Sequence, residues 1–285
     1  MTATIAVMTA SSNSGAAAVE ALLAHPSKPR VRAIFRDQAK ATAFKEQSTS
    51  DLLEVVGGAD ASKPETLDGV FAGASAAIVV TPHFDFAKDA ELTVAMLRAA
   101  EGQGVGRAVM IGSWTVAAPE TIIAQRFVPT EAFLRDETKM KWTVLRSGYF
   151  CGNYAGLFKG KDAVYFPEIT VPPVDPTDIG RVAAAICVDA DPSTHDAKCY
   201  DISGPEQLTT TEIVDKVKKA TARPDIAYHA VPVAGLKPPA PPEFLIQLLT
   251  YIDAHGLPCD AITKTLSGRH TTFDQYLAEH LEDFS

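Results

Sequence analysis

The chain has 285 residues, a length that predicts one large domain or one domain with a smaller appendage. Hydrophobic residues make up 46% of it and charged residues 21%, a balance that argues against disorder. Lys and Arg number 26 against 35 Asp and Glu, and this net charge of −9 without a basic cluster argues against a nucleic-acid partner.

Neither the apolar runs nor the cysteines suggest a membrane or metal site. The longer apolar runs, such as Ala74–Pro82, are far shorter than the roughly 20 residues that a membrane helix needs. The opening segment Thr2–Met8 is too short for the apolar region of a signal peptide. The cysteines lie far apart without the spacing of a zinc site, which favours free thiols in a cytoplasmic protein. They are Cys151, Cys187, Cys199 and Cys259.

Short apolar runs alternate with helical patterns through the first half of the chain. The predicted strands are Thr4–Met8, Val31–Phe35, Leu52–Val56, Ala76–Val80, Arg107–Ile111 and Trp142–Arg146. The predicted helices are Ala16–Ala24, Gln38–Phe44, a segment through Phe71 that opens on a capping box of Ser62 and Glu65, Asp85–Gln103 and Thr130–Arg135. Strands separated by connections long enough for crossovers predict an α/β fold with a doubly wound parallel sheet of the Rossmann type.

After Gly148 the pattern becomes mainly helical, and prolines crowd at Pro167–Pro176 and Lys237–Pro242. The expected elements are helices at Asp178–Val188, Thr209–Ala222, Pro242–His255 and Phe273–Leu281, with short strands at Lys198–Ile202 and Ile226–Val231. We therefore expect residues 1–148 to form the sheet and residues 149–285 to form a smaller, mainly helical lobe packed on it.

The first strand-to-helix turn, Met8–Gly15, has the place of a phosphate-binding loop, because a helix N-terminus with unpaired N–H groups follows it. Dinucleotide loops carry three glycines, whereas here the three positions are Thr9, Ser12 and Gly15. The polar residues that could still bind a phosphate are Ser11, Ser12, Asn13 and Ser14. The alternative is an N-capping loop without a ligand.

The second strand ends in a cation, Arg36, and Lys40 lies one helical turn further on. In this fold an Arg at this place accommodates the extra phosphate of NADP, whereas an acidic residue binds the ribose hydroxyls of NAD. Arg36 and Lys40 together could flank that phosphate. The alternative is that both are ordinary solvated charges.

The order of these segments resembles the NmrA-like family of atypical short-chain dehydrogenases. The segments that carry the resemblance are Ile5–Leu23, Val31–Lys40, Glu54–Asp60, Val79–Pro82, Trp142–Arg146, Tyr200–Pro205 and Gly268–Phe273. They cover nearly the whole chain in order. The resemblance implies that residues 1–148 bind NADP(H) and that residues 149–285 bind a small-molecule substrate, in a monomer or homodimer.

On the adenosine side, the resemblance implies that Thr9–Gly15 faces the pyrophosphate. Arg36 and Lys40 would meet the adenosine phosphate, and Asp60 with Ala59 would lie near the adenine.

On the nicotinamide side, the resemblance assigns Thr81, Pro82 and His83 to the ribose. Ser113 ends the fifth strand, where other short-chain dehydrogenases place a catalytic Ser. Further residues follow the sixth strand, where the family borders nicotinamide and substrate. These are Tyr149, Phe150 and Asn153, and Ser147 replaces a family proline there.

Two departures affect the expected chemistry. The glycine loop keeps only its last glycine, Gly15, and the family's Lys after the fifth strand is absent from Gln125–Glu131, where Arg126 is one residue away. The chain also has no Tyr-x-x-x-Lys, and a Tyr needs a neighbouring cation to lower its pKa for proton transfer. The candidate catalytic residues are His83, Ser113 and Tyr149, with His83 the best proton donor because the ordinary pKa of a His lies near neutrality.

Three interpretations stay open. The first is an NADP(H)-dependent oxidoreductase that reduces a small, largely apolar or aromatic substrate. The second is a non-catalytic regulatory protein that senses NADP(H), and the third is a redox-neutral isomerase whose altered loop no longer binds a dinucleotide. A pocket rim or plain core would explain the aromatic residues equally well. They are His83, Trp114, Tyr149, Phe150 and Tyr154, and beside them Cys151 is expected to be buried.

Overall fold

The structure, a computed structural model, describes residues 3–83, 85–237 and 241–285, so the proline run Lys237–Pro242 includes residues 238–240 that lie outside it. The chain divides into two compact units. The first unit comprises the residues up to Pro119 together with Ala124–Arg146 and Pro176–Tyr200. The second unit comprises Glu120–Ile123, Ser147–Asp175 and Asp201–Ser285.

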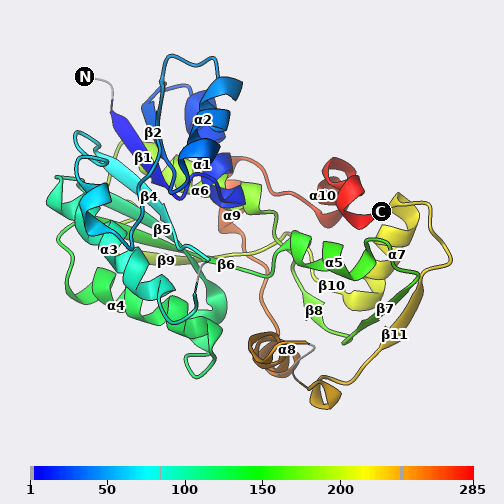
Figure 1. Ribbon diagram of the computed structural model, residues 1–285. Helices are drawn as coiled ribbons and strands as arrows, with labels where there is room; N and C mark the ends of the chain where they lie inside the picture. Colours follow the sequence, from blue (N-terminus) through cyan, green and yellow to red (C-terminus); the bar gives the residue numbers. More distant parts are fainter. Residues whose placement is uncertain (1–2, 84, 238–240) are drawn as a thin grey trace. The chain divides into compact units, whose positions relative to one another are not determined.

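The main sheet has seven strands in the order β3-β2-β1-β4-β5-β6-β9 (Figure 1). Their bounds are β1 Thr4–Met8, β2 Arg30–Ile34, β3 Leu53–Val56, β4 Ala76–Val80, β5 Arg107–Ser113, β6 Lys141–Ser147 and β9 Lys198–Ile202. The chain runs outward from β1 to β3 and returns to β4 on the other side of β1, with parallel pairing throughout these strands. This order confirms the doubly wound parallel sheet.

The seventh strand, β9, corrects one prediction, since we expected Lys198–Ile202 to belong to the smaller lobe. The Ala197 N–H donates to the carbonyl of Trp142 at 2.8 Å, and the Gly148 N–H donates to that of Ile202 at 2.7 Å, which makes β9 parallel to β6. As the edge strand it keeps most of its side chains at least partly exposed. An exposed edge strand lacks the apolar run of a central strand such as β4, so its sequence pattern is weak.

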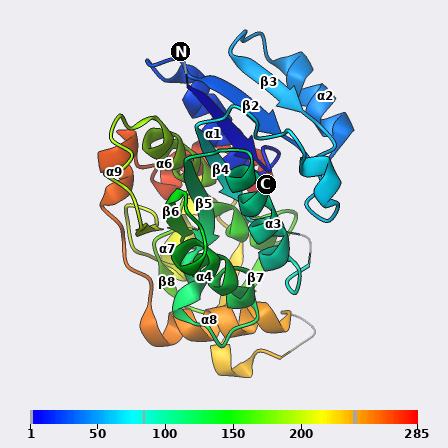
Figure 2. The ribbon, with the colours of Figure 1, turned by 90° about the vertical axis from the view of Figure 1, so that its left-hand side faces the viewer.

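Helices cover both faces of the sheet (Figures 1 and 2). The helices of the first unit are α1 Asn13–Ala24, α2 Gln38–Gln47, α3 Asp89–Gly102, α4 Val128–Asp136 and α6 Pro176–Val188, with 3-10 turns at Pro64–Leu67, Trp114–Ala117 and Ile123–Arg126. Helices α1 and α6 pack against each other, and α3 packs against α4. Helix α6, which we expected in the lobe, is thus part of the first unit.

The predicted capping box of Ser62 and Glu65 is wrong. Only the short 3-10 turn Pro64–Leu67 forms there, and its N-cap makes no side-chain bond. The Ser62 hydroxyl instead donates to Asp60 Oδ1 at 2.8 Å. The Ser62 N–H, which the Glu65 side chain would accept in a capping box, donates to Asp60 Oδ1 at 3.0 Å instead.

A close helix contact fixes the start of α1. A Cβ added to Gly180 of α6 would lie 2.5 Å from the carbonyl oxygen of Ser14 and 2.6 Å from the nitrogen of Ala18. Only glycine permits this approach, because real Cβ atoms essentially never come so close. The N-terminus of α1 is therefore held by packing from α6 as well as by its own capping.

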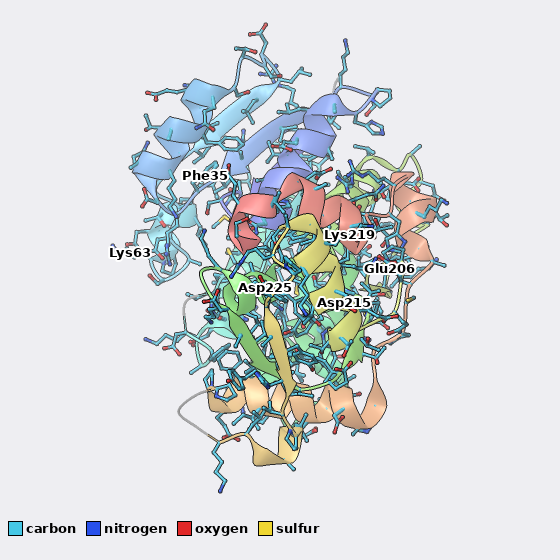
Figure 3. The ribbon with its side chains drawn as sticks, turned by 90° about the vertical axis from the view of Figure 1, so that its right-hand side faces the viewer. Phe35, Lys63, Glu206, Asp215, Lys219 and Asp225 are labelled. Atoms are coloured by element: carbon cyan, nitrogen blue, oxygen red, sulfur yellow. The ribbon has the colours of Figure 1, made fainter. Side chains whose placement is uncertain are left out.

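The second unit is mainly helical, as expected, with two small two-stranded sheets. Its elements are α5 Ala155–Phe158, β7 Ala163–Phe166, β8 Thr170–Val171, β10 Leu208–Thr209, α7 Thr210–Ala220, β11 Ala227–Ala230, α8 Glu243–His255, α9 Ile262–Ser267, α10 Phe273–Glu279 and α11 Leu281–Phe284, with 3-10 turns at Cys151–Tyr154 and Val233–Gly235. Helix α7 begins with a capping box of Thr209 and Glu212 and presents Asp215 and Lys219 on its exposed face (Figure 3). None of the helices in the described ranges is long and apolar enough to cross a membrane.

Candidate functional site

The strand order reverses at one place, between β1 and β4, and ligands of open α/β sheets bind beyond the carboxyl ends of the strands at such a point. The turn after β1 begins at Thr9, and the turn after β4 begins at Thr81. The Thr9 hydroxyl donates to the carbonyl of Val80, the last residue of β4, at 3.0 Å. The turn after β1 is therefore bonded directly to the carboxyl end of β4.

Thr9 occupies the place of the first glycine in the loop. Its φ of 65° lies in the left-handed region, which is a clear outlier for a β-branched residue and costs about 1–2 kcal/mol. The bond from its hydroxyl to Val80 opposes this cost. Thr9 thus adopts the glycine-like turn with the help of a side-chain hydrogen bond.

Ser12 occupies the place of the second glycine and is the N-cap of α1. Its hydroxyl donates to the carbonyl of Thr9 at 2.9 Å and accepts from the N–H of Gly15 at 3.1 Å. Ser12 therefore caps the helix through its side chain. Because the Ser12 hydroxyl donates its proton to Thr9 within the turn, it does not point a donor toward a phosphate as the sequence suggested.

The capped helix still offers donors to an anion. Asn13 and Ser14 are its first two residues, and their N–H groups have no hydrogen-bond partner within the part of the chain that the structure describes. Asn13 and Ser11 are exposed, whereas Ser14 is buried. A Cβ on Gly15 would lie 2.5 Å from the Thr9 carbonyl oxygen, so the third glycine is required by close packing. This cradle fits the pyrophosphate of a dinucleotide.

The segments after β2 and β3 lie side by side. The Phe35 N–H donates to Val56 at 2.8 Å, and the Ala59 N–H donates back to Phe35 at 3.1 Å. Arg36 therefore comes near Asp60, and its positive charge helps to lower the pKa of that carboxyl, although the hydrogen bond from Ser62 lowers it more.

The two expected cations of the adenosine side are both exposed. The charge of Arg36 lowers the pKa of both Asp37 and Asp60, and Lys40 lies in the first turn of α2. The pKa of Asp37 is lowered mainly by the N–H groups of Lys40 and Ala39, which its side chain caps. Lys63, labelled in Figure 3, adds a further positive charge near Asp60 that sequence reasoning missed. The site offers cations to a phosphate, and their binding role stays a prediction.

The turn after β4 has a buried polar group without a partner. The Thr81 hydroxyl is inaccessible to solvent and makes no hydrogen bond within the described residues. His83 is exposed, and its ring lies edge-on to that of Phe86 with 5.6 Å between the centroids. A buried hydroxyl without a partner is costly, and a polar ligand at this edge would satisfy it.

Arg126 is not an exposed cation in the place of the family's Lys. It is buried, its Nε donates to Asp89 Oδ2 at 2.8 Å, and its Nη2 donates to the Pro82 carbonyl at 2.8 Å. Burial lowers the pKa of Arg126 and the charge of Asp89 opposes this shift. Because a guanidinium stays protonated in proteins, Arg126 cannot serve as a proton donor.

Hydroxyl groups also follow the next two strands. The Ser113 hydroxyl, at the end of β5, accepts from the Thr115 N–H at 3.3 Å. The buried hydroxyls of Thr115 and of Ser147, the last residue of β6, have no partner within the described residues. Sequence reasoning missed both as candidate ligand contacts.

In the second unit, Tyr149 is buried and burial raises the pKa of its phenol well above the ordinary value. With this raised pKa, Tyr149 can act only through its protonated hydroxyl. Its ring packs 5.3 Å from that of Tyr154, which is fully buried against Phe166 and Phe273 and is core. Asn153 is exposed.

The thiols match the expectation from the sequence. Cys151 is buried, and none of the four cysteines forms a disulfide. Burial raises the pKa of the Cys187 thiol to about 12. A buried thiol with a raised pKa is inert.

Comparison with known proteins identifies relatives. Residues 10–186 match a family described as NAD(P)H-binding. The chain is 25% identical over 277 residues to the NAD(P)H azoreductase of Xenophilus azovorans, covering 92% of this chain and 93% of that protein. A Citrobacter triphenylmethane reductase complexed with NADP(H) superposes with a TM-score of 0.78 at 20% identity, over 96% of this chain and 99% of that one. NmrA, a negative transcriptional regulator in complex with NAD, gives a TM-score of 0.73 at 15% identity, over 98% and 95%. The reductase and NmrA both share the fold of this chain.

Proposed function

The chain belongs to the NAD(P)H-binding family, and we propose from that premise that it is an NADP(H)-dependent oxidoreductase that reduces a small, largely apolar or aromatic molecule. The resemblance to the NmrA-like atypical short-chain dehydrogenases is confirmed by the family match and by the fold shared with NmrA. One observation carries the proposal. Beside the capped N-terminus of α1, the buried Thr81 hydroxyl has no partner within the described residues.

The residues of the first unit are suited to the two halves of the cofactor. The N–H groups of Asn13 and Ser14 would bind the pyrophosphate, and Arg36 with Lys40 would bind the extra phosphate of NADPH. The Thr81 hydroxyl would contact the nicotinamide side. When bound, NADPH supplies a hydride to the substrate.

The proton is the part of the reaction that this chain must supply. His83 is exposed in the turn after β4, whereas Tyr149 is buried with a raised pKa and Arg126 is committed to Asp89. We therefore assign His83 as the donor. The variant His83→Gln should lower kcat about a hundredfold, a larger effect than its effect on NADPH binding. An unchanged kcat would remove His83 from the reaction.

The sensor interpretation has one observation in its favour, because neither a Tyr with a lowered pKa nor a free Lys stands in the expected catalytic place. The isomerase interpretation is weakened by the match of residues 10–186 to an NAD(P)H-binding family, because it requires a loop that no longer binds a dinucleotide.

Consumption of NADPH tests the proposal against both alternatives. Purified protein is mixed with NADPH and, in turn, with an azo compound, a triarylmethane dye, a quinone and an imine. A reductase consumes NADPH with at least one acceptor. Binding of NADPH without consumption by any acceptor would support the sensor, and absence of binding would support the isomerase.

A further inference from the structure

Two arginines are buried among the described residues, Arg107 and Arg126, each with 8% of its surface exposed. Both lie in the first unit and both donate to backbone carbonyls. Arg107 begins β5 and bonds Ile186 and Asp189, at the amino ends of the strands. Arg126 lies near the carboxyl ends, beside the turn after β4.

The contacts of Arg126 gather around Asp89, which begins α3 and is wholly buried. One carboxylate oxygen accepts from Arg126 Nε, and the other accepts from the N–H of Asp85 at 3.1 Å. The guanidinium also lies 5.3 Å from the ring centre of Phe86. The residues directly before α3 are thus fastened to the buried ion pair.

The same guanidinium fastens the other end of the connection between β4 and α3. Its Nη2 donates to the carbonyl of Pro82 at 2.8 Å. Thr81 precedes Pro82 directly and His83 follows it. The position of Thr81 and His83 therefore depends on one buried cation that bonds the residue between them.

We infer that Arg126 is a positioning residue for the nicotinamide half of the cofactor. It holds Thr81–His83 to Asp85 and Asp89, so that the Thr81 hydroxyl faces the ligand. This inference rests on the proposed function. A planar guanidinium can bond Asp89 and Pro82 at once through separate N–H groups, whereas the ammonium of a Lys is a point charge that cannot match this fork.

The inference predicts an effect confined to one half of the cofactor. Calorimetric titration with NADPH and with 2′,5′-ADP, which has only the adenosine half, distinguishes an effect on the nicotinamide half from one on the adenosine half. We expect Arg126→Lys to weaken NADPH binding about tenfold, which corresponds to the loss of one hydrogen bond. The affinity for 2′,5′-ADP should change by less than about twofold. The matched control is Arg107→Lys, which loses similar bonds at the opposite ends of the strands and should change neither affinity.

Each outcome decides the inference. Equal weakening of both ligands by Arg126→Lys, or no weakening of either, overturns it while the proposed function stands. If the wild-type protein binds neither ligand, the proposed function itself fails and the inference fails with it. If Arg126→Lys does not fold, hydrogen exchange on the wild-type protein decides. NADPH, but not 2′,5′-ADP, must then slow exchange at Thr81, His83 and Asp85, and equal protection by both overturns the inference.

Discussion

The two sides of the reversal in strand order are built differently. On the side of β2 and β3, the polar groups are the exposed charges of Arg36 and Lys40 and the partly exposed Asp60. On the side of β4 and β5, they are the buried pair of Arg126 and Asp89 and the buried Thr81 hydroxyl. The charges of the first side are open to solvent, whereas on the second side His83 is exposed beside a buried ion pair.

Because of this difference, substitutions on the two sides should affect ligand affinity and the free energy of unfolding differently. Exposed ion pairs contribute about 0–1 kcal/mol to the free energy of unfolding. Breaking a buried pair by removing one partner costs about 3–5 kcal/mol, because a buried charge is left without compensation. Substitutions beside β2 should therefore change ligand affinity alone, whereas substitutions beside β4 should also change stability.

The largest expected effect is that of Asp89→Asn. It leaves Arg126 buried without its counter-charge and should lower the free energy of unfolding by about 3–5 kcal/mol in urea titrations. The matched control is Asp136→Asn, which breaks the exposed pair with Arg135 and should cost less than about 1 kcal/mol. Equal losses in the two variants would mean that the buried pair does not differ from a surface pair.

On the exposed side, Arg36→Met should weaken NADPH binding by about 1.5–3 kcal/mol, or roughly tenfold to a hundredfold, through the loss of a charged hydrogen bond. Binding of NADH, which lacks the extra phosphate, should not change, and neither should the urea midpoint. Lys45→Met, in the last turn of α2, is the control and should leave both affinities as they are. A parallel loss of NADH affinity would show that Arg36 does not select the phosphate.

Between the two sides, Gly15→Ala tests the tight turn after β1. Its Cβ would meet the Thr9 carbonyl oxygen at 2.5 Å, and such overpacking should cost about 1–3 kcal/mol of unfolding free energy. Gly156→Ala, in α5, has no atom within 4 Å of the new Cβ and should not destabilise. A stable Gly15→Ala protein with full NADPH affinity would refute the required close packing.

The smallest expected effect is that of Ser12→Gly. Glycine is a tolerated N-cap, so the loss should be only a few tenths of a kcal/mol, and NADPH affinity should change by less than about threefold. A large gain in affinity would instead show that the natural loop is impaired, as the isomerase interpretation requires.

Sequence patterns predicted the middle of the sheet well because an inner strand such as β4 is a continuous apolar run. Strand β4 is buried along its whole length, and its bounds were predicted as observed. Strand β9 was recognised as a strand but assigned to the lobe, since an exposed edge strand carries no sign of its partner. The N-cap at Ser12 was one of two interpretations, and only the geometry showed where its proton goes.

The buried pair of Arg126 and Asp89 could not be predicted. Its members lie 37 residues apart, and no local pattern connects a Gln-Arg-Phe sequence with the start of a distant helix. Arg126 drew attention only as a misplaced cation. The buried hydroxyls of Thr115 and Ser147, which have no partner among the described residues, could not be predicted for a similar reason. Burial of a hydroxyl depends on neighbours that only the fold supplies.

Calorimetric titration of the wild-type protein with NADPH and with NADH tests the central claim most directly. The cradle at α1 and the cation at Arg36 predict saturable heat with NADPH and an affinity for NADH at least about tenfold weaker, as expected for the loss of one charged contact. No heat with either cofactor at millimolar concentration would contradict the account and leave only the fold.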